Sequence, residues 1–165
     1  MPKISIRYQK ISDAKRFFTI LSNPNFIFIP TKVKSIEEER KWLKENGRKR
    51  KNKIQHNYSI LFDALVVGAV GIRINQNRNH VGEIGYFLDE NFWGQGITTK
   101  AVKLAEREAF KKLRLKRLEI LMQPANKASE KVAIKNGYKK EGLMKKAVKN
   151  KQGHLRDLFL YAKTI

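Results

Sequence analysis

The 165-residue sequence contains no cysteine. This absence excludes disulfide bonds, thiolate metal sites and cysteine nucleophiles, and nothing points to an oxidising compartment. Proline is also scarce, with four residues in the whole chain. Neither a Pro-rich nor a Gly/Ser-rich linker divides the sequence, and no internal repeat is visible. The length and the 41% apolar residues therefore predict a single folded domain over residues 1–165.

Long hydrophobic runs are missing as well. No apolar run approaches the roughly 18 residues that a membrane-spanning helix requires. The longest one, Ala64 to Val70, is broken by Gly68 and is typical of a strand. The first residues, Met1 to Ser5, lack the apolar core of a signal peptide. We therefore expect a soluble, cytoplasmic protein that does not bind membranes.

Acidic residues are few. The chain has 15 Asp and Glu against 36 Lys and Arg, which gives a net charge of +21. Such a charge attracts polyanions, so RNA, ribosomes, nucleotides and phosphorylated substrates are candidate partners; a compositional bias toward lysine is the alternative. The densest basic run, Lys44 to Lys53, is interpreted as a solvated helix end and loop. No aromatic residues alternate with its charges, as a base-stacking surface would require, so any contact with nucleic acid is expected to be nonspecific.

Apolar periodicity predicts an α/β fold in which helices flank a mixed sheet. Strands are expected at 4–8, 58–62, 65–74, 81–88, 118–122, 141–148 and 155–161, and helices from 13, from 35 to about 46–47, at 98–113 and at 126–136. Ser35 and Glu38 have the spacing of a capping box, and Gly137 is suited to end a helix. The strand–helix–strand order over residues 81–122 predicts two parallel strands in the middle of the sheet.

The segment Leu88 to Thr99 (LDENFWGQGITT) lies between a predicted strand and a predicted helix start. Gly94 and Gly96 allow a ligand to approach the backbone closely. The free N–H groups of residues 94–99 would face outward with the positive end of the helix dipole, which is how helices bind pyrophosphate. The segment matches neither the P-loop nor the dinucleotide fingerprint. An ordinary tight turn is the alternative interpretation.

Four blocks of sequence resemble the GNAT superfamily of N-acetyltransferases, in the branch that contains the ribosomal-protein N-terminal (RimJ/RimL-like) enzymes. The blocks are GEIGYFLD (82–89), FWGQGITT (92–99), PANKAS (124–129) and NGYKKEG (136–142). The resemblance extends over roughly residues 3–163. It implies a central mixed sheet of about six to seven strands, about four helices, and acetyl-CoA as the acetyl donor, with coenzyme A as the product.

The resemblance also implies where acetyl-CoA binds. The strand that ends at Leu88 would carry a bulge and splay from the strand at 118–122, so that backbone groups of Phe87 and Leu88 pair with the pantetheine arm. The N–H groups of the glycine loop would hold the pyrophosphate. This cofactor set comprises Phe87, Leu88, Gly94, Gln95, Gly96, Ile97, Thr98, Thr99, Asn126 and Ser129. The sequence departs from the family pattern at Trp93, where Gln or Arg is usual, and at Thr98, which would either contact phosphate or cap the helix.

Two residues are candidates for catalysis. Glu83 has a position similar to that of the glutamate base in some family members, although a structural glutamate paired with a basic residue is the alternative. Asn126 and Ser129 form an Asn-x-x-Ser unit that is typical of a helix N-cap. Many family members have a tyrosine one turn later that acts as the general acid and protonates the thiolate, but that position is Ala133 here. In the branch that this sequence resembles, a serine at position 129 would protonate the leaving thiolate.

The three histidines, His56, His80 and His154, do not have metal-ligand spacing. The sequence therefore predicts no metal site and no Ser-His-Asp triad. His80 and His154 are alternative candidates for a base, and Tyr138 is expected to pack in the core.

The acceptor should bind between the first two helices, their connection and the last hairpin. The connection, Asn23 to Lys34, holds Phe26, Phe28, Ile29 and Pro30, which would either grip a substrate or close the core. The resemblance implies an amine acceptor such as a ribosomal-protein N-terminus, which attacks acetyl-CoA directly in a ternary complex. An amino sugar or another small amine is an alternative, although the charge of +21 disfavours free polyamines. A non-catalytic RNA- or ribosome-binding module is the alternative from another class. Either a monomer or a homodimer is compatible with the sequence.

Overall fold

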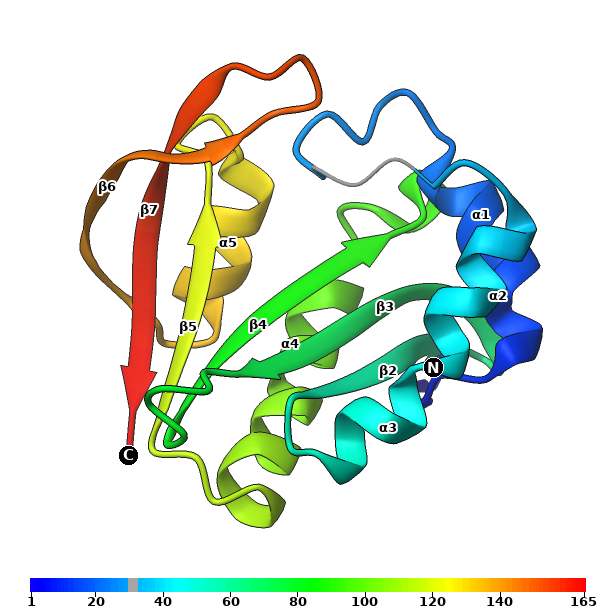
Figure 1. Cartoon of the computed structure of the whole chain (residues 1–165), viewed down its shortest axis with the longest axis horizontal. Helices are drawn as coiled ribbons and strands as arrows, with labels where there is room; N and C mark the ends of the chain where they lie inside the picture. The colour runs from blue at the N-terminus through cyan, green and yellow to red at the C-terminus, as the bar shows by residue number, and fades with distance from the viewer. Residues whose placement is uncertain (30–32) are drawn as a thin grey trace.

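The computed structural model describes residues 1–29 and 33–165 (Figure 1). The strands are β1 (Ile4–Tyr8), β2 (Gln55–Phe62), β3 (Leu65–Ile74), β4 (Val81–Leu88), β5 (Arg117–Met122), β6 (Lys139–Lys149) and β7 (Leu155–Thr164). The α-helices are α1 (Ala14–Leu21), α2 (Ile36–Lys44), α3 (Asn46–Lys51), α4 (Ile97–Arg107) and α5 (Lys127–Lys135). No helix within the described ranges is both long enough and apolar enough to cross a membrane.

The seven strands of the described residues form one sheet in the order β1-β2-β3-β4-β5-β7-β6. Every neighbouring pair is antiparallel except β4 and β5, which are parallel because α4 connects them. The predicted α/β fold with a mixed sheet and a central parallel pair is therefore confirmed.

The sheet opens between its two parallel strands. β4 and β5 pair only over Val81–Glu83 and Arg117–Glu119, and beyond this point the two strands diverge (Figure 1). The expected splay is confirmed, but the expected bulge in β4 is wrong, because β4 keeps an unbroken register with β3. The extra residue is Val67 of β3, which interrupts the register with β2.

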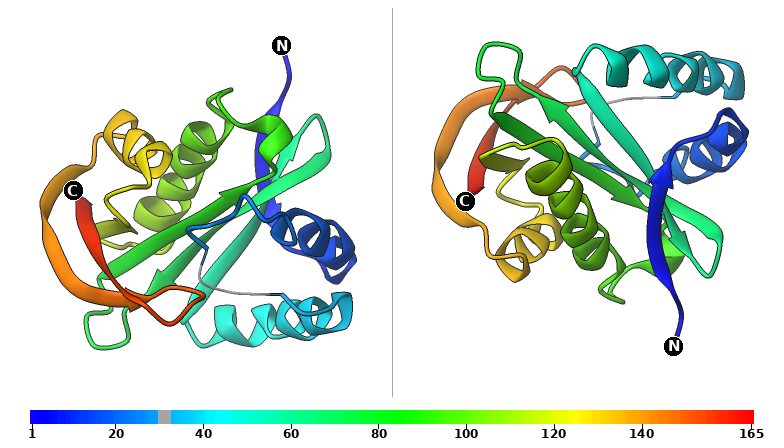
Figure 2. Two further views of the ribbon diagram at one scale, coloured as in Figure 1. Left: turned by 90° about the horizontal axis from the view of Figure 1, so that it is seen from above. Right: turned by 90° about the horizontal axis from the view of Figure 1, so that it is seen from below.

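Helices cover both faces of the sheet (Figure 2). On one face α4 and α5 pack against the main core, to which α4 contributes fully buried small side chains such as Ala101, Val102 and Ala105. On the other face Phe17 of α1 and Leu43 of α2 form a smaller cluster with Ala69 and Phe87. The helices leave part of β4 uncovered, because Gly85 in the middle of the strand is exposed.

Two helix ends test the capping predictions. Ser35 caps α2 as expected, because its hydroxyl accepts a hydrogen bond from the N–H of Glu38. This helix ends at Lys44, a few residues before the predicted end near Gly47, but a further helix that was not predicted, α3, follows and continues to Lys51. Asn46 is buried and bonds the side chains of Gln9 and Asn57, so a tertiary anchor holds the chain in helical geometry there. Much of the basic run is consequently a helix rather than a loop.

Candidate active site

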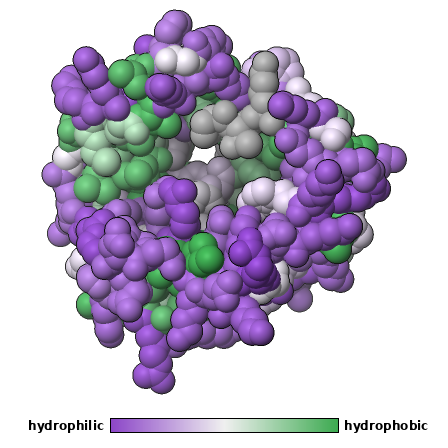
Figure 3. All heavy atoms as spheres, in the orientation of Figure 1, coloured by the Kyte–Doolittle hydropathy of each residue, from purple (hydrophilic) through white to green (hydrophobic). Residues whose placement is uncertain are grey.

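A cavity of about 620 Å³ lies where the carboxyl end of β4, the glycine loop and the start of α5 meet. Its described lining consists of residues 25–29, 86–88, 92–94, 96–99, 126, 128–129, 131–132 and 135. The space-filling view shows the surface hollowed between the β5–β7 side and the α1–α2 side (Figure 3). The cavity therefore continues the opening between the two parallel strands.

The glycine loop has the geometry of an anion site. Gly94 and Gly96 have φ angles of 75° and 74°, which residues other than glycine rarely adopt. Within the described residues, the N–H groups from Gly94 to Thr99 donate no hydrogen bond, and Lys100 makes the first bond of α4 to the carbonyl of Gly96. These N–H groups present the positive end of the α4 dipole to a ligand. Gly96 is the N-cap of α4, so Thr98 is not the cap that was considered.

Two contacts fix the chain between the end of β4 and the glycine loop. The indole N–H of Trp93 donates to the carbonyl oxygen of Leu88 at 2.8 Å, and Arg16 of α1 pairs with Asp89 at 2.5 Å. Trp93 also packs edge-on against Phe26, with ring centroids 5.8 Å apart. Trp93, which replaces the usual Gln or Arg, thus fixes the loop to the strand. The side chain of Gln95 does not line the cavity; its amide nitrogen lies 3.4 Å from the carbonyl oxygen of Asn91.

The backbone of β4 offers different groups from those expected. Asp89 donates its N–H to Val67 of β3 at 2.8 Å. Since hydrogen bonding alternates along an antiparallel strand, Phe87 also faces β3, and a Cβ placed on Gly68 would lie only 2.2 Å from its carbonyl oxygen. The backbone groups that face the opening belong to Tyr86 and Leu88. The expected role of the Phe87 backbone is therefore wrong, and its side chain packs against Phe17.

Asn126 and Ser129 act together at the start of α5. The Asn126 side chain accepts a hydrogen bond from the N–H of Ser129 at 3.1 Å, which confirms the predicted N-cap. The Ser129 side chain is 9% exposed, and its hydroxyl oxygen lies 2.7 Å from the phenol oxygen of Tyr86. The cavity therefore contains a pair of hydrogen-bonded hydroxyl groups.

Tyr86 is a site residue that sequence reasoning missed. It lies on β4 and reaches α5, 43 positions later in the chain. Burial raises the pKa of Tyr86 to about 12, against the lowering effect of its hydrogen bond with Ser129. The phenol is therefore protonated at neutral pH, and it has two acceptors within reach, the Ser129 hydroxyl oxygen at 2.7 Å and the Ser129 carbonyl oxygen at 3.3 Å. When it donates to the hydroxyl, the serine proton is free for another acceptor.

Two lysines were also missed. Lys131 and Lys135 lie one turn apart on α5 and line the cavity. They are the only charged side chains in its described lining, which holds no carboxylate. Their i, i+4 spacing after the Asn-x-x-Ser unit was the available sequence signal. The cavity thus combines free N–H groups with two cations, and this is a suitable environment for phosphate groups.

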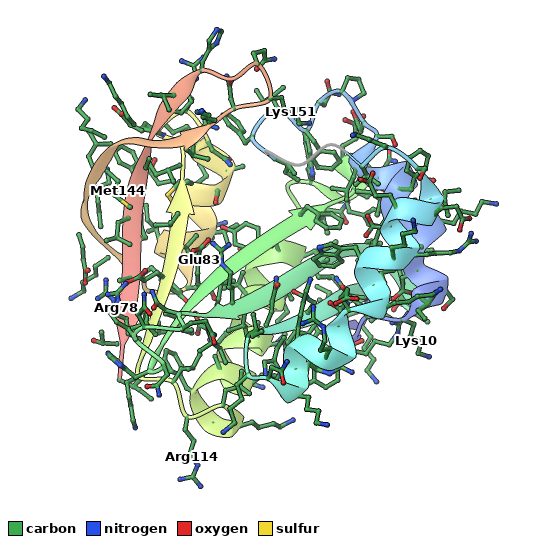
Figure 4. The ribbon with its side chains drawn as sticks, in the orientation of Figure 1. Lys10, Arg78, Glu83, Arg114, Met144 and Lys151 are labelled. Atoms are coloured by element: carbon green, nitrogen blue, oxygen red, sulfur yellow. The ribbon has the colours of Figure 1, made fainter. Side chains whose placement is uncertain are left out.

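Glu83 lies in a second cavity, of about 430 Å³, which shares Asn126 and Ile27–Ile29 with the first. Its carboxylate pairs with Arg73 of the neighbouring strand at 2.8 Å. Glu83 points into the space between β4 and β5 (Figure 4). The structural pairing foreseen for Glu83 is therefore present, and Glu83 lines the second cavity but not the first. Pro30, which was expected to contribute to this region, lies outside the described residues.

The histidines are separate from both cavities, because none of them contributes to the described linings. His56 is buried beside Tyr8, 3.2 Å from its hydroxyl oxygen, whereas His80 and His154 are exposed. The described residues contain no group of three or more His, Asp or Glu side chains placed to hold a metal ion. Tyr138 is buried in the core, as expected.

Comparison with known proteins agrees with this geometry. Residues 3–139 match the acetyltransferase (GNAT) domain family. A probable N-acetyltransferase of Bacillus subtilis, YjcK, is 34% identical over 118 residues, 70% of this chain and 65% of the relative. The chain thus spans slightly less than two thirds of that relative. The ribosomal-protein-serine acetyltransferase of Escherichia coli is 29% identical over 136 residues, 82% of this chain and 75% of the relative.

The solved structures show the same relationship. RimL, a ribosomal L7/L12 alpha-N-protein acetyltransferase in complex with coenzyme A, superposes with a TM-score of 0.89 at 27% identity, covering 98% of this chain and 94% of RimL. Together with the open central sheet and the glycine loop, these matches establish that the chain belongs to the GNAT acetyltransferase family.

Proposed function

We propose that this protein is an acetyl-CoA-dependent N-acetyltransferase that acts on a protein N-terminal amine. The observation that carries the proposal is that two cavities lie side by side and share the lining residues Asn126 and Ile27–Ile29. The first offers a phosphate-binding helix start and a hydroxyl pair, and the second contains a carboxylate. Two substrates bound at once would meet at these shared residues, and no covalent enzyme intermediate is required.

The residues of the first cavity fit acetyl-CoA. The N–H groups of the glycine loop and the ammonium groups of Lys131 and Lys135 would hold its phosphates. The backbone of Tyr86 and Leu88 would pair with the amide groups of the pantetheine arm. Acetyl-CoA supplies an activated acetyl thioester. RimL, whose structure holds coenzyme A, has the same fold, which supports this assignment.

Ser129 is the proposed donor to the leaving sulfur. Attack by an amine forms the C–N bond and breaks the C–S bond, so the sulfur departs as a thiolate that needs a proton. When the phenol of Tyr86 donates to the Ser129 hydroxyl, the serine O–H is directed elsewhere and made a better donor. Tyr86 is then a positioning residue for Ser129. The tyrosine absent at position 133 is thereby replaced by a buried hydroxyl pair.

Glu83 is the proposed acceptor of the amine proton. An ammonium group must lose one proton before attack and a second one after it. The Glu83 carboxylate borders the second cavity, so it can take up a proton directly or through water. Its ion pair with Arg73 holds the carboxylate in place on the strand. Glu83 is the one carboxylate in the described lining of this cavity, and a single carboxylate is well suited to receive one ammonium group.

The choice of a protein N-terminus rests on two observations. The relatives include acetyltransferases named for ribosomal proteins. The second cavity is also bordered by the tip of the β6–β7 hairpin and by residues 27–29, and this open arrangement suits the end of a chain.

Calorimetry with acetyl-CoA tests the donor half of this proposal. We expect saturable binding by the wild type and at least a tenfold loss in Gly96→Glu, because the new carboxylate would face the phosphates and strain a positive φ angle. Gly96→Gln is the matched control, since it imposes the same backbone strain without the negative charge and should lose less affinity than Gly96→Glu. Circular dichroism checks that each variant is folded. An absence of binding by the wild type would refute the enzyme and favour a non-catalytic basic module.

A further inference from the structure

The second cavity has an uneven charge distribution. About half of its described lining is apolar, with Leu121, Met122, Val148 and Leu158 among the apolar members. The charged side chains of that lining are Arg73, Glu83, Lys149 and Lys151. Glu83 lies on the sheet, whereas Lys151 lies on the hairpin at the upper rim (Figure 4). One end of the cavity therefore holds the carboxylate of Glu83, and the other end holds the ammonium groups of Lys149 and Lys151.

The two lysines of the hairpin have no carboxylate partner among the described residues. Arg73 and Glu83 neutralise each other, because they form an ion pair at 2.8 Å. Asp157, which lies on the hairpin, pairs with Lys145 rather than with Lys149 or Lys151. Residues 30–32, which lie outside the described ranges, are Pro, Thr and Lys and bring no carboxylate by sequence. The hairpin end of the cavity consequently carries positive charge that the chain itself does not neutralise.

Lys151 is held at the cavity mouth rather than extended into solvent. Its ammonium group donates to the carbonyl oxygen of Phe26 at 3.1 Å. The turn that carries it is also ordered, because the Asn150 side chain accepts hydrogen bonds from the N–H groups of Gln152 and His154 at 3.1 and 2.9 Å. An ammonium group has three donors, so Lys151 keeps two for a ligand.

We propose that the acceptor is an N-terminal amine followed within its first few residues by carboxylate side chains. This inference rests on the function proposed above. The amine would lie beside Glu83, and the carboxylates would contact Lys149 and Lys151 at the other end. Free polyamines and lysine-rich N-termini are poor acceptors, since their additional positive charges meet two lysines that no carboxylate offsets.

The test compares three peptides of equal length that begin with the same residue and carry Glu, Gln or Lys at positions two to four. Acetylation is followed by the release of coenzyme A. We expect kcat/KM to fall in the order Glu, Gln, Lys, by about three- to tenfold per step at low salt. The differences should shrink at high ionic strength, because the lysines are exposed.

A pair of charge-reversal variants makes the test specific. Lys149→Glu combined with Lys151→Glu should abolish or invert the order of the three peptides. Lys103→Glu combined with Lys111→Glu changes the net charge by the same amount on exposed positions outside both linings, and it should keep the wild-type order. Both variants should bind acetyl-CoA like the wild type.

The outcomes separate the two proposals. If all three peptides are acetylated equally well, or if the control variant loses the order as completely as the cavity variant, the acidic acceptor is refuted while the acetyltransferase stands. If no peptide is acetylated although acetyl-CoA binds, the protein N-terminal acceptor is refuted, and the present inference with it.

Discussion

At the scale of single residues, the hydroxyl pair in the first cavity makes the sharpest kinetic prediction. Ser129→Ala should lower kcat about 100-fold, in the range for loss of a positioned acid. Tyr86→Phe keeps the serine but removes the phenol that orients it, so we expect a smaller loss of about tenfold. The KM for acetyl-CoA should change little in either variant. Steady-state kinetics with both substrates varied measures this separation.

Tyr138→Phe is the matched control for the tyrosine. It also removes a buried phenol oxygen, one that has no hydrogen-bond partner within the described residues. Its kcat should therefore stay at the wild-type value. In the double variant of Ser129 and Tyr86, the loss should equal that of Ser129→Ala alone, because the phenol acts through the serine. Fully multiplicative losses would contradict the positioning role.

Asp13 makes a prediction for stability. Burial of Asp13 opposes ionisation, but hydrogen bonds from Arg7, the Lys10 backbone and Ser59 outweigh it and lower the pKa of the carboxyl. A lowered pKa contributes stability above the unfolded value of about 3.9, and this contribution disappears as pH falls through the folded value. In urea unfolding at pH 7, the free energy of unfolding of the wild type should exceed that of Asp13→Asn by about 1–3 kcal/mol. This difference should disappear as the pH falls below about 4. A gap that is independent of pH would contradict this role of the charge.

The candidate site shows which residues a sequence reveals. Asn126 and Ser129 were predictable because their hydrogen bond is local, three positions apart, and such caps have a recognisable spacing. Tyr86 was not, because its partner lies 43 positions away and nothing in a strand pattern indicates which residue faces it. The backbone groups of Phe87 were expected to face the opening, whereas those of Tyr86 do so. A strand pattern does not indicate which N–H groups face which adjacent strand.

At the scale of elements, Gly68 controls the approach of β3 to β4. A Cβ at this position would lie 2.2 Å from the carbonyl oxygen of Phe87, which belongs to the rigid backbone. Gly68→Ala should therefore destabilise the protein by about 2–4 kcal/mol, as overpacking against backbone does, and it should weaken acetyl-CoA binding by shifting the end of β4. Thermal unfolding and calorimetry measure the two effects.

Gly85→Ala provides the comparison on the neighbouring strand. An added Cβ at Gly85 meets no atom within 4 Å, so its stability should stay within about 1 kcal/mol of the wild type. Equal losses in the two variants would show that strand glycine in general, rather than the contact at Gly68, is responsible.

The bounds of strands and helices were predicted about equally well, to within a few residues, and the main omission is α3. Both β3 and β4 have the expected bounds, and the start of β3 is defined locally because its apolar run follows the Asp63–Ala64 turn. That turn has positive φ angles of 46° and 70°, as a tight hairpin requires. The continuation of the chain into α3 was missed because Asn46 is held by Gln9, 37 positions earlier. Boundaries that depend on tertiary contacts do not appear in a local pattern.

At the scale of the whole molecule, the net charge of +21 predicts nonspecific binding to RNA. Filter binding should show similar affinity for unrelated RNA sequences, and log–log plots against salt should fall with a slope of about −0.7 for each phosphate neutralised. Acetyl-CoA binding should persist in high salt better than RNA binding does, because backbone N–H groups contribute to it. Sequence-selective or salt-insensitive RNA binding would contradict a diffuse electrostatic origin.

The opening in the sheet also has a thermodynamic consequence. Only three residue pairs join β4 to β5, so the β1–β4 and β5–β7 parts of the sheet depend on α4 and α5 for much of their association. A ligand that pairs with the edge of β4 acts as an additional strand and couples its own binding to folding. At a concentration 100 times its Kd, such a ligand adds about 2.7 kcal/mol to the stability of the native state. The cellular level of such a ligand would then set both the occupancy of the site and the folded fraction of the chain.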